Sequence, residues 1–239
     1  METSRTPLSE SLLKTRSQLI ILIVILIVPT LVLSKDVPRS STLSSRLHVI
    51  NPQNPQGLRE LFRYTGESEY FVSAHRGGPQ QKLPENCIQT FENTLQHTFS
   101  IMEIDPRYTK DGAIVVHHDA TLERTTTGKG RVVDMTLREL KELRLKDTEG
   151  IVTKFQIPTL DDVLQWARGK TILVIDQKDV PVEVRVRKVR EHRAEAYAML
   201  LVYSFKDARK CYELNKNIMM EVMIPNRERF YEFEKTDIP

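Results

Sequence analysis

Short apolar segments alternate with amphipathic helical segments after Phe71, and this alternation limits the folds that the chain can adopt. The segment 171–176 is apolar along nearly its whole length, as expected of a strand that is covered on both faces. Strands that alternate with helices in this way form a parallel α/β sheet. The predicted strands are 70–74, 101–105, 171–176, 198–203 and 218–223, and the predicted helices are 87–97 (with Asn86 as N-cap), 160–167, 182–193, 207–214 and 227–234.

One additional predicted strand, which ends at His118, cannot pair in parallel with the strand that ends at Asp105. Only about seven residues separate the two strands, whereas a parallel crossover needs a dozen or more. Asp111 and Gly112 are typical of a two-residue hairpin turn. A hairpin centred on this pair places His118 directly opposite Asp105, so we expect their side chains to share one site.

Ionisable side chains lie at or near the ends of the predicted strands, where parallel α/β proteins bind their ligands. Glu103 and Asp105 are two residues apart, so both face the same side of their strand. Two carboxylates on an inward face repel each other unless a cation lies between them. This inventory suits metal-assisted acid–base chemistry on a phosphate ester. The candidate residues are His75, Arg76, Glu85, Glu103, Asp105, His118, Asp176 and Lys178.

Short motifs occur in a fixed order from His75 onward: H-R-G-G, P-E-N, E-I-D, H-D and T-T-x-G-x-G. Together with IPTLDDVLQWA and VIDQK, they resemble the glycerophosphodiester phosphodiesterase family over residues 71–179. The resemblance implies a TIM-type (β/α)8 barrel, in which the β-hairpin is an excursion after the second strand. About five of the eight strands of such a barrel are found, so we expect the chain to be C-terminally incomplete.

The resemblance also implies roles for the basic residues of the site. His75 and His118 would be the catalytic residues, because an imidazole can give or take a proton near neutral pH. Arg76 and Lys178 would bind the substrate phosphate. Glu85 would have a supporting role, by orienting Arg76 or the metal shell.

The acidic residues are expected to hold the cofactor. By resemblance, Glu103, Asp105 and Asp176 would bind one divalent cation, and their oxygen ligands suit either Mg²⁺ or Ca²⁺. The family usually has Glu-x-Lys where this chain has Asp176-Gln-Lys. The missing methylene could change the distance from this residue to the metal.

The implied activity is metal-dependent hydrolysis of glycerophosphodiesters to glycerol phosphate and an alcohol, with a small-molecule phosphodiester as the partner. Two alternatives stay open: a phospholipase that acts on lipid or lysolipid, and a non-catalytic, truncated binding module. A net charge of +3 does not point to nucleic acid. We further expect the basic run at 184–193 to be a solvated helix face, and Cys87 and Cys211 to be free thiols.

An apolar segment without charge lies at 19–33 and follows Arg5, Lys14 and Arg16. Its length suits a signal peptide, and an uncleaved anchor that associates the chain with a membrane is the alternative. Either one places the remainder of the chain outside the cytoplasm. The expected organisation is a basic region at 1–18, the signal peptide or anchor at 19–34, a linker at 35–57 and the phosphodiesterase domain at 58–239.

Overall fold

The structure is a computed structural model that describes residues 47–66 and 71–236 of the chain. The predicted basic region 1–18, the apolar segment 19–34 and residues 35–46 of the predicted linker lie outside the described residues. Within the described residues, no helix is both long enough and apolar enough to cross a membrane.

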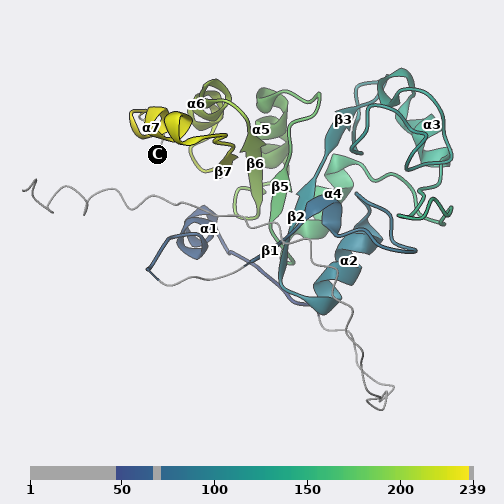
Figure 1. Cartoon of the computed structure of the whole chain (residues 1–239), viewed down its shortest axis with the longest axis horizontal. Coiled ribbons are helices and arrows are strands. Elements are labelled where there is room, and N and C mark those ends of the chain that lie inside the picture. Colours follow the sequence, from purple (N-terminus) through teal and green to yellow (C-terminus); the bar gives the residue numbers. More distant parts are fainter. Residues whose placement is uncertain (1–46, 67–70, 237–239) are drawn as a thin grey trace, which may run out of the picture.

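Five parallel strands form a curled sheet in the order β1-β2-β5-β6-β7, and this sheet resembles half of a barrel (Figure 1). Adjacent strands pair in register, with Ala74 opposite Met102 and Glu103 opposite Val174. The predicted strands are therefore confirmed, although their ends differ from the prediction by one or two residues. The bounds are β1 Val72–Ala74, β2 Ser100–Ile104, β5 Leu173–Ile175, β6 Ala198–Val202 and β7 Met220–Val222.

Helices cover the outer face of the sheet. Met102, Ile104 and Leu173 are fully buried, and they pack with apolar residues of these helices in one large core. The predicted helices are confirmed, and in the first four of them buried apolar residues recur with the period of an α-helix and face this core. The bounds are α2 Ile88–His97, α4 Leu160–Ala167, α5 Val182–Glu191, α6 Phe205–Leu214 and α7 Arg227–Glu234.

The inner face of the sheet has a separate apolar core. Ile101 and Val174 pack there with Ile50 and with Leu58 of the short helix α1 (Pro55–Leu61). Figure 1 shows α1 on the opposite side of β1 and β2 from α2. Apolar side chains thus fill the amino-terminal part of the inner face, which leaves its carboxyl end for polar groups.

Residues 106–159, which we call the excursion, extend beyond the end of β2 (Figure 1). They form a small core of their own around Val115, Leu122 and Leu140. The elements of the excursion are β3 Pro106–Tyr108, β4 Ile114–Val116, the 3-10 turn η3 Val132–Asp134 and α3 Leu137–Glu142. The strands β3 and β4 are antiparallel, which confirms the predicted hairpin.

The predicted register of this hairpin is wrong by one residue. His117, rather than His118, lies opposite Asp105, and its backbone N–H donates to the Asp105 carbonyl oxygen at 2.7 Å. A two-residue turn of the type I′ needs a positive φ at both central residues. Gly112 has a φ of 77°, but Asp111 is not among the residues with positive φ, so the connection is a longer loop.

Two expectations about individual side chains have different outcomes. Cys87 and Cys211 are free, as predicted, and both are buried. Arg185, in contrast, is fully buried and is an exception to the predicted solvated face of α5. Its Nη1 donates to the carbonyl oxygens of Ile175 at 3.2 Å and Leu201 at 2.8 Å, and burial lowers its pKa. The arginine is buried because these carbonyl groups at the ends of β5 and β6 accept its hydrogen bonds.

Gly77 ends the 3-10 turn η2 (His75–Gly77) and packs against α2. It has a φ of 82°, and a Cβ atom at this position would lie 2.1 Å from Cδ1 of Phe91. We predict that Gly77→Ala lowers the free energy of unfolding by about 3–5 kcal/mol, because backbone strain and an overlap in the core add together. Urea denaturation followed by circular dichroism measures this change.

Gly112→Ala is the matched control. Gly112 has a similar φ of 77°, but no heavy atom lies within 4 Å of the added Cβ position. The control variant should therefore lose about 1–2 kcal/mol, from backbone strain alone. Equal losses in the two variants would show that contact between Gly77 and Phe91 contributes nothing.

Candidate active site

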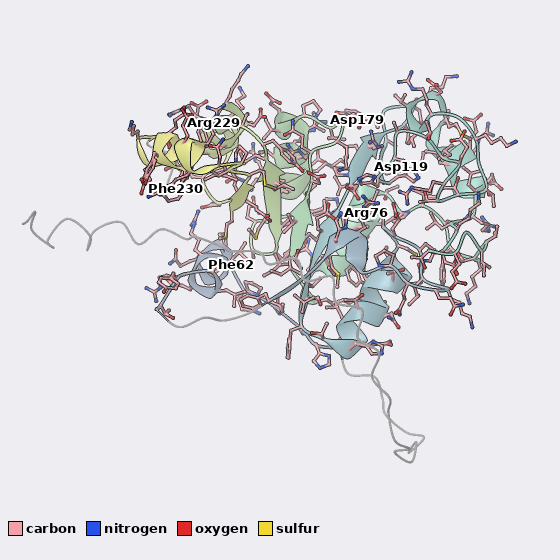
Figure 2. All side chains as sticks on the ribbon, viewed as in Figure 1. Phe62, Arg76, Asp119, Asp179, Arg229 and Phe230 are labelled. Atoms are coloured by element: carbon pink, nitrogen blue, oxygen red, sulfur yellow. The ribbon has the colours of Figure 1, made fainter. Side chains whose placement is uncertain are left out.

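The carboxyl ends of the parallel strands meet at one edge of the sheet, and predicted site residues follow them. His75 directly follows β1, Asp105 follows β2 and Asp176 follows β5. Figure 2 shows Arg76, from the end of β1, near Asp119 of the excursion. The fold thus gathers side chains that are far apart in the sequence.

Glu103, Asp105 and Asp176 form an acidic cluster, in which one oxygen from each residue lies within 4.8 Å of the others. Asp105 is 1% exposed and Asp176 is 3% exposed, while Glu103 is half-buried. Burial, followed by the negative charge of Asp105, raises the pKa of Glu103 to about 8. Carboxylates this close repel one another where water is scarce, so a cation among them would stabilise the site.

Lys178 and Tyr203 contact the acidic cluster. Lys178 Nζ lies 3.0 Å from Asp105 Oδ1 and also pairs with Asp176. The Tyr203 hydroxyl donates to Asp176 Oδ1 at 2.8 Å, and burial followed by this hydrogen bond raises the pKa of Tyr203. Tyr203 was not predicted as a site residue; its place at the end of the predicted strand 198–203 is the one sequence signal that pointed toward it.

Asn86 holds the carboxylate of Asp105 and is a second residue that was missed. Its Nδ2 donates to Asp105 Oδ2 at 2.7 Å, and the Asp105 backbone N–H donates back to Asn86 Oδ1 at 3.2 Å. The predicted capping role is wrong, because Cys87 is the N-cap residue of α2. Asn86 has a φ of 54°, a conformation that asparagine adopts more readily than most residues.

Arg76 joins the acidic cluster to Glu85. Its backbone N–H donates to Glu103 Oε2 at 2.8 Å, and its Nη1 donates to Glu85 Oε2 at 3.2 Å. Its Nε lies 3.9 Å from Asp105 Oδ2. Arg76 has a φ of 54°, so the chain adopts an uncommon conformation where its N–H reaches the cluster. Glu85 therefore makes the contact with Arg76 that its predicted orienting role requires.

The two histidines predicted to be catalytic differ in their surroundings from His117. The pKa of His75 is lowered by partial burial and then by the charge of Arg76. The charge of Asp105 acts in the opposite direction on this pKa, and the charge of His118 adds a smaller lowering effect. His117 is buried, and both of its ring nitrogens are engaged, one of them with Thr125 Oγ1 at 2.8 Å. His117 therefore has a structural role.

Arg124 is a third residue that sequence reasoning missed. Its guanidinium donates to the carboxylates of Glu85 and Asp119 through hydrogen bonds of 2.6–2.9 Å. Asp119 Oδ1 in turn lies 2.7 Å from His118 Nδ1. Arg124 and Glu85 are 39 positions apart, and local periodicity carries no information about such a contact.

The acidic cluster fits a hard divalent cation. It supplies three carboxylates, and Mg²⁺ and Ca²⁺ both prefer oxygen ligands. Within the described residues, the buried Asp105 Oδ1 has Lys178 Nζ as an ion-pair partner at 3.0 Å and accepts no other hydrogen bond. A buried carboxylate oxygen left in this state has the coordination capacity that a metal ligand needs.

The fold is similar to solved glycerophosphodiester phosphodiesterases. One from Parabacteroides distasonis has a TM-score of 0.79 and 43% identity, and the match covers 81% of this chain and 68% of that chain. One from Agrobacterium tumefaciens has a TM-score of 0.54 and 26% identity over 64% of this chain and 66% of that chain. These similarities confirm the predicted fold class: the curled sheet is part of a TIM-type (β/α)8 barrel.

Curated relatives carry the same name. The glycerophosphodiester phosphodiesterase of Caldanaerobacter subterraneus subsp. tengcongensis is 35% identical over 151 residues, which are 58% of this chain and 61% of the relative. That of Bacillus altitudinis is 37% identical over 109 residues, which are 44% of this chain and 43% of the relative. The chain thus spans less than two thirds of the length of these relatives.

The model of the glycerophosphoryl diester phosphodiesterase family matches residues 75–227, more than half of the chain. The chain therefore belongs to the glycerophosphoryl diester phosphodiesterase family.

Proposed function

We propose that this protein hydrolyses glycerophosphodiesters to glycerol phosphate and an alcohol. The observation that carries the proposal is the acidic cluster, which lies at the same edge of the sheet as two imidazoles and two cationic side chains. Membership of the family and the names of the relatives support it. The substrate would be a small phosphodiester of glycerol and an alcohol.

We assign a single divalent cation, Mg²⁺ or Ca²⁺, to the acidic cluster. When bound, it would supply positive charge to the phosphoryl oxygens of the substrate. Asn86 and Tyr203 hold two of the ligands, Asp105 and Asp176, through the hydrogen bonds described above. The contact with Tyr203 gives the short side chain of Asp176 a fixed position.

His75 and His118 would move the protons of the reaction. A hydroxyl oxygen, from water or from the glycerol of the substrate, forms a bond to phosphorus, and the bond from phosphorus to the alcohol oxygen breaks. Attack by the glycerol hydroxyl gives a cyclic phosphate, which water then opens to glycerol phosphate. One imidazole takes the proton of the attacking hydroxyl, and the other gives a proton to the leaving oxygen. The lowered pKa of His75 favours its neutral form near pH 7, which is able to accept a proton.

Arg76 and Lys178 would bind the phosphate of the substrate. Arg76 Nε and Lys178 Nζ lie near opposite oxygens of Asp105, at 3.9 Å from Oδ2 and 3.0 Å from Oδ1. A guanidinium can offer two parallel N–H groups to a phosphate, and an ammonium adds a point charge. Both would lower the free energy of the transition state by neutralising charge on the phosphoryl oxygens.

The full chain incubated with glycerophosphocholine should release glycerol phosphate. EDTA should abolish the release, because the acidic cluster needs its cation, and added Mg²⁺ or Ca²⁺ should restore it. Glycerol phosphate measured by a coupled assay provides the readout. Activity confined to lysolipid or phospholipid vesicles would replace the proposal with the phospholipase alternative, and metal binding without any turnover would favour the binding module.

His75→Ala and His118→Ala should each lower kcat by about 10²–10⁴-fold, because each removes a group that transfers a proton. Isothermal titration calorimetry should show that both variants still bind the metal, which the carboxylates hold. His97→Ala is the control, since His97 is exposed and contacts the Asn93 carbonyl of its own helix. Normal turnover in either site variant would contradict the assigned roles.

The location outside the cytoplasm, which the segment 19–33 predicts, stays a proposal. Alkaline phosphatase is active only when it is exported from a bacterial cytoplasm, so it can be fused to the C-terminus of the full chain. We expect an active fusion in a bacterial host, and a loss of phosphatase activity when residues 19–33 are deleted. Equal phosphatase activity in both fusions would contradict export through this segment.

A further inference from the structure

His118, Asp119 and Arg124 form a line of contacts beside the site. His118 Nδ1 lies 2.7 Å from Asp119 Oδ1. Arg124 donates to the same carboxylate with two nitrogens, from Nε to Oδ2 at 2.6 Å and from Nη2 to Oδ1 at 2.9 Å. Neither Asp119 nor Arg124 is a metal ligand or a proton-transfer group in the proposed reaction.

We propose that Asp119 and Arg124 are positioning residues for His118. Asp119 keeps the proton of the neutral imidazole on Nδ1, and Arg124 holds the carboxylate of Asp119 in place. Nε2 of His118 is then the nitrogen that exchanges a proton with the substrate. The proposal rests on the proposed function, because it assigns to His118 a part in proton transfer.

The tautomer follows from the chemistry of the contact. An ionised carboxylate only accepts hydrogen bonds. The short distance to His118 Nδ1 is therefore a hydrogen bond in which Nδ1–H is the donor. In a neutral imidazole the other nitrogen then carries the lone pair. A carboxylate that orients a histidine in this way stabilises the tautomer and the ring position that proton transfer requires.

Arg124 keeps Asp119 ionised and fixed. Hydrogen bonds from Arg124 are the largest influence that holds the pKa of Asp119 well below its usual range. The two-pronged contact also prevents rotation of the carboxylate, because both oxygens accept from one planar guanidinium. Asp119 is consequently an orienting acceptor for His118, and it does not take the proton itself.

The same guanidinium connects the segment that carries His118 to Glu85. Arg124 donates from Nη1 to Glu85 Oε2 and from Nη2 to Glu85 Oε1, both at 2.8 Å. Glu85 also accepts from Arg76, which follows β1. The excursion that carries His118 is thereby held against the segment that carries Arg76. This connection fixes the position of His118 relative to the rest of the site.

An ordinary surface ion pair is the alternative explanation, since the Arg124 side chain is 50% exposed. Exposed ion pairs contribute little to stability. The side chains of its two partners, however, are only 12% and 25% exposed, and each has a second partner in the site: Arg76 for Glu85 and His118 for Asp119. A test must therefore measure the tautomer of His118, and not only the stability of the protein.

The test is nitrogen NMR of the full chain labelled with ¹⁵N-histidine, at a pH where the imidazoles are neutral. The His118 signals are assigned by their loss in His118→Gln. We expect Nδ1–H in the wild-type protein and a change toward Nε2–H, the form preferred by a free histidine side chain, in Asp119→Ala and in Arg124→Ala. In the glycerophosphocholine assay, kcat should fall by about 10–100-fold in both variants while KM changes little.

Asp134→Ala and Arg131→Ala are the matched controls. These two residues form an ion pair of 4.0 Å in the same excursion, and both side chains are 65% exposed. Neither control should change the tautomer of His118 or kcat. Circular dichroism identifies any variant that fails to fold, and the more exposed Arg124→Ala then provides the result in place of Asp119→Ala.

The two proposals can fail separately. An unchanged tautomer in a folded Asp119→Ala or Arg124→Ala protein would overturn the positioning role, whatever the activity. An unchanged kcat in an active enzyme would also overturn it. If the tautomer changes as expected but the wild-type protein releases no glycerol phosphate from any diester, the positioning pair stands and the proposed function fails.

Discussion

Repulsion within the acidic cluster is the constraint on which the arrangement of the site depends. Two like unit charges 4 Å apart repel by roughly 4 kcal/mol at an effective dielectric constant of about 20. Donors offset this repulsion from several directions: the side chains of Asn86 and Tyr203, the backbone N–H of Arg76 and the ammonium group of Lys178. These donors come from four different places in the chain, so the carboxylates are held together only when the strands and the loops that follow them are assembled.

The order and type of the elements could be predicted because local periodicity determines them. The predicted helix 227–234 matches α7 at both ends, and the apolar run 171–176 contains β5. The hairpin register could not be predicted, because it depends on whether Asp111 adopts a positive φ. An error of one residue at that turn exchanges the places of His117 and His118, since side chains alternate along a strand.

The acidic cluster could be anticipated because carboxylates that end neighbouring parallel strands meet at the same edge. Glu103, Asp105 and Asp176 are brought together in this way, whereas their role as metal ligands stays a prediction. Asn86 and Arg124 could not be found by the same reasoning. They lie in loops, and their contacts join residues that are 19 and 39 positions apart. Such contacts depend on how loops pack across the end of the sheet, and no local pattern encodes that packing.

The buried Arg185 has a consequence for how this sequence can vary. Its guanidinium satisfies carbonyl groups of Ile175 and Leu201, which lie one position before Asp176 and two positions before Tyr203. A shorter or neutral residue would leave both carbonyl groups without this donor, at a cost of about 1–3 kcal/mol for each buried group. The constraint from the site therefore extends to a residue of the outer helix layer, and position 185 should tolerate few substitutions over evolutionary time.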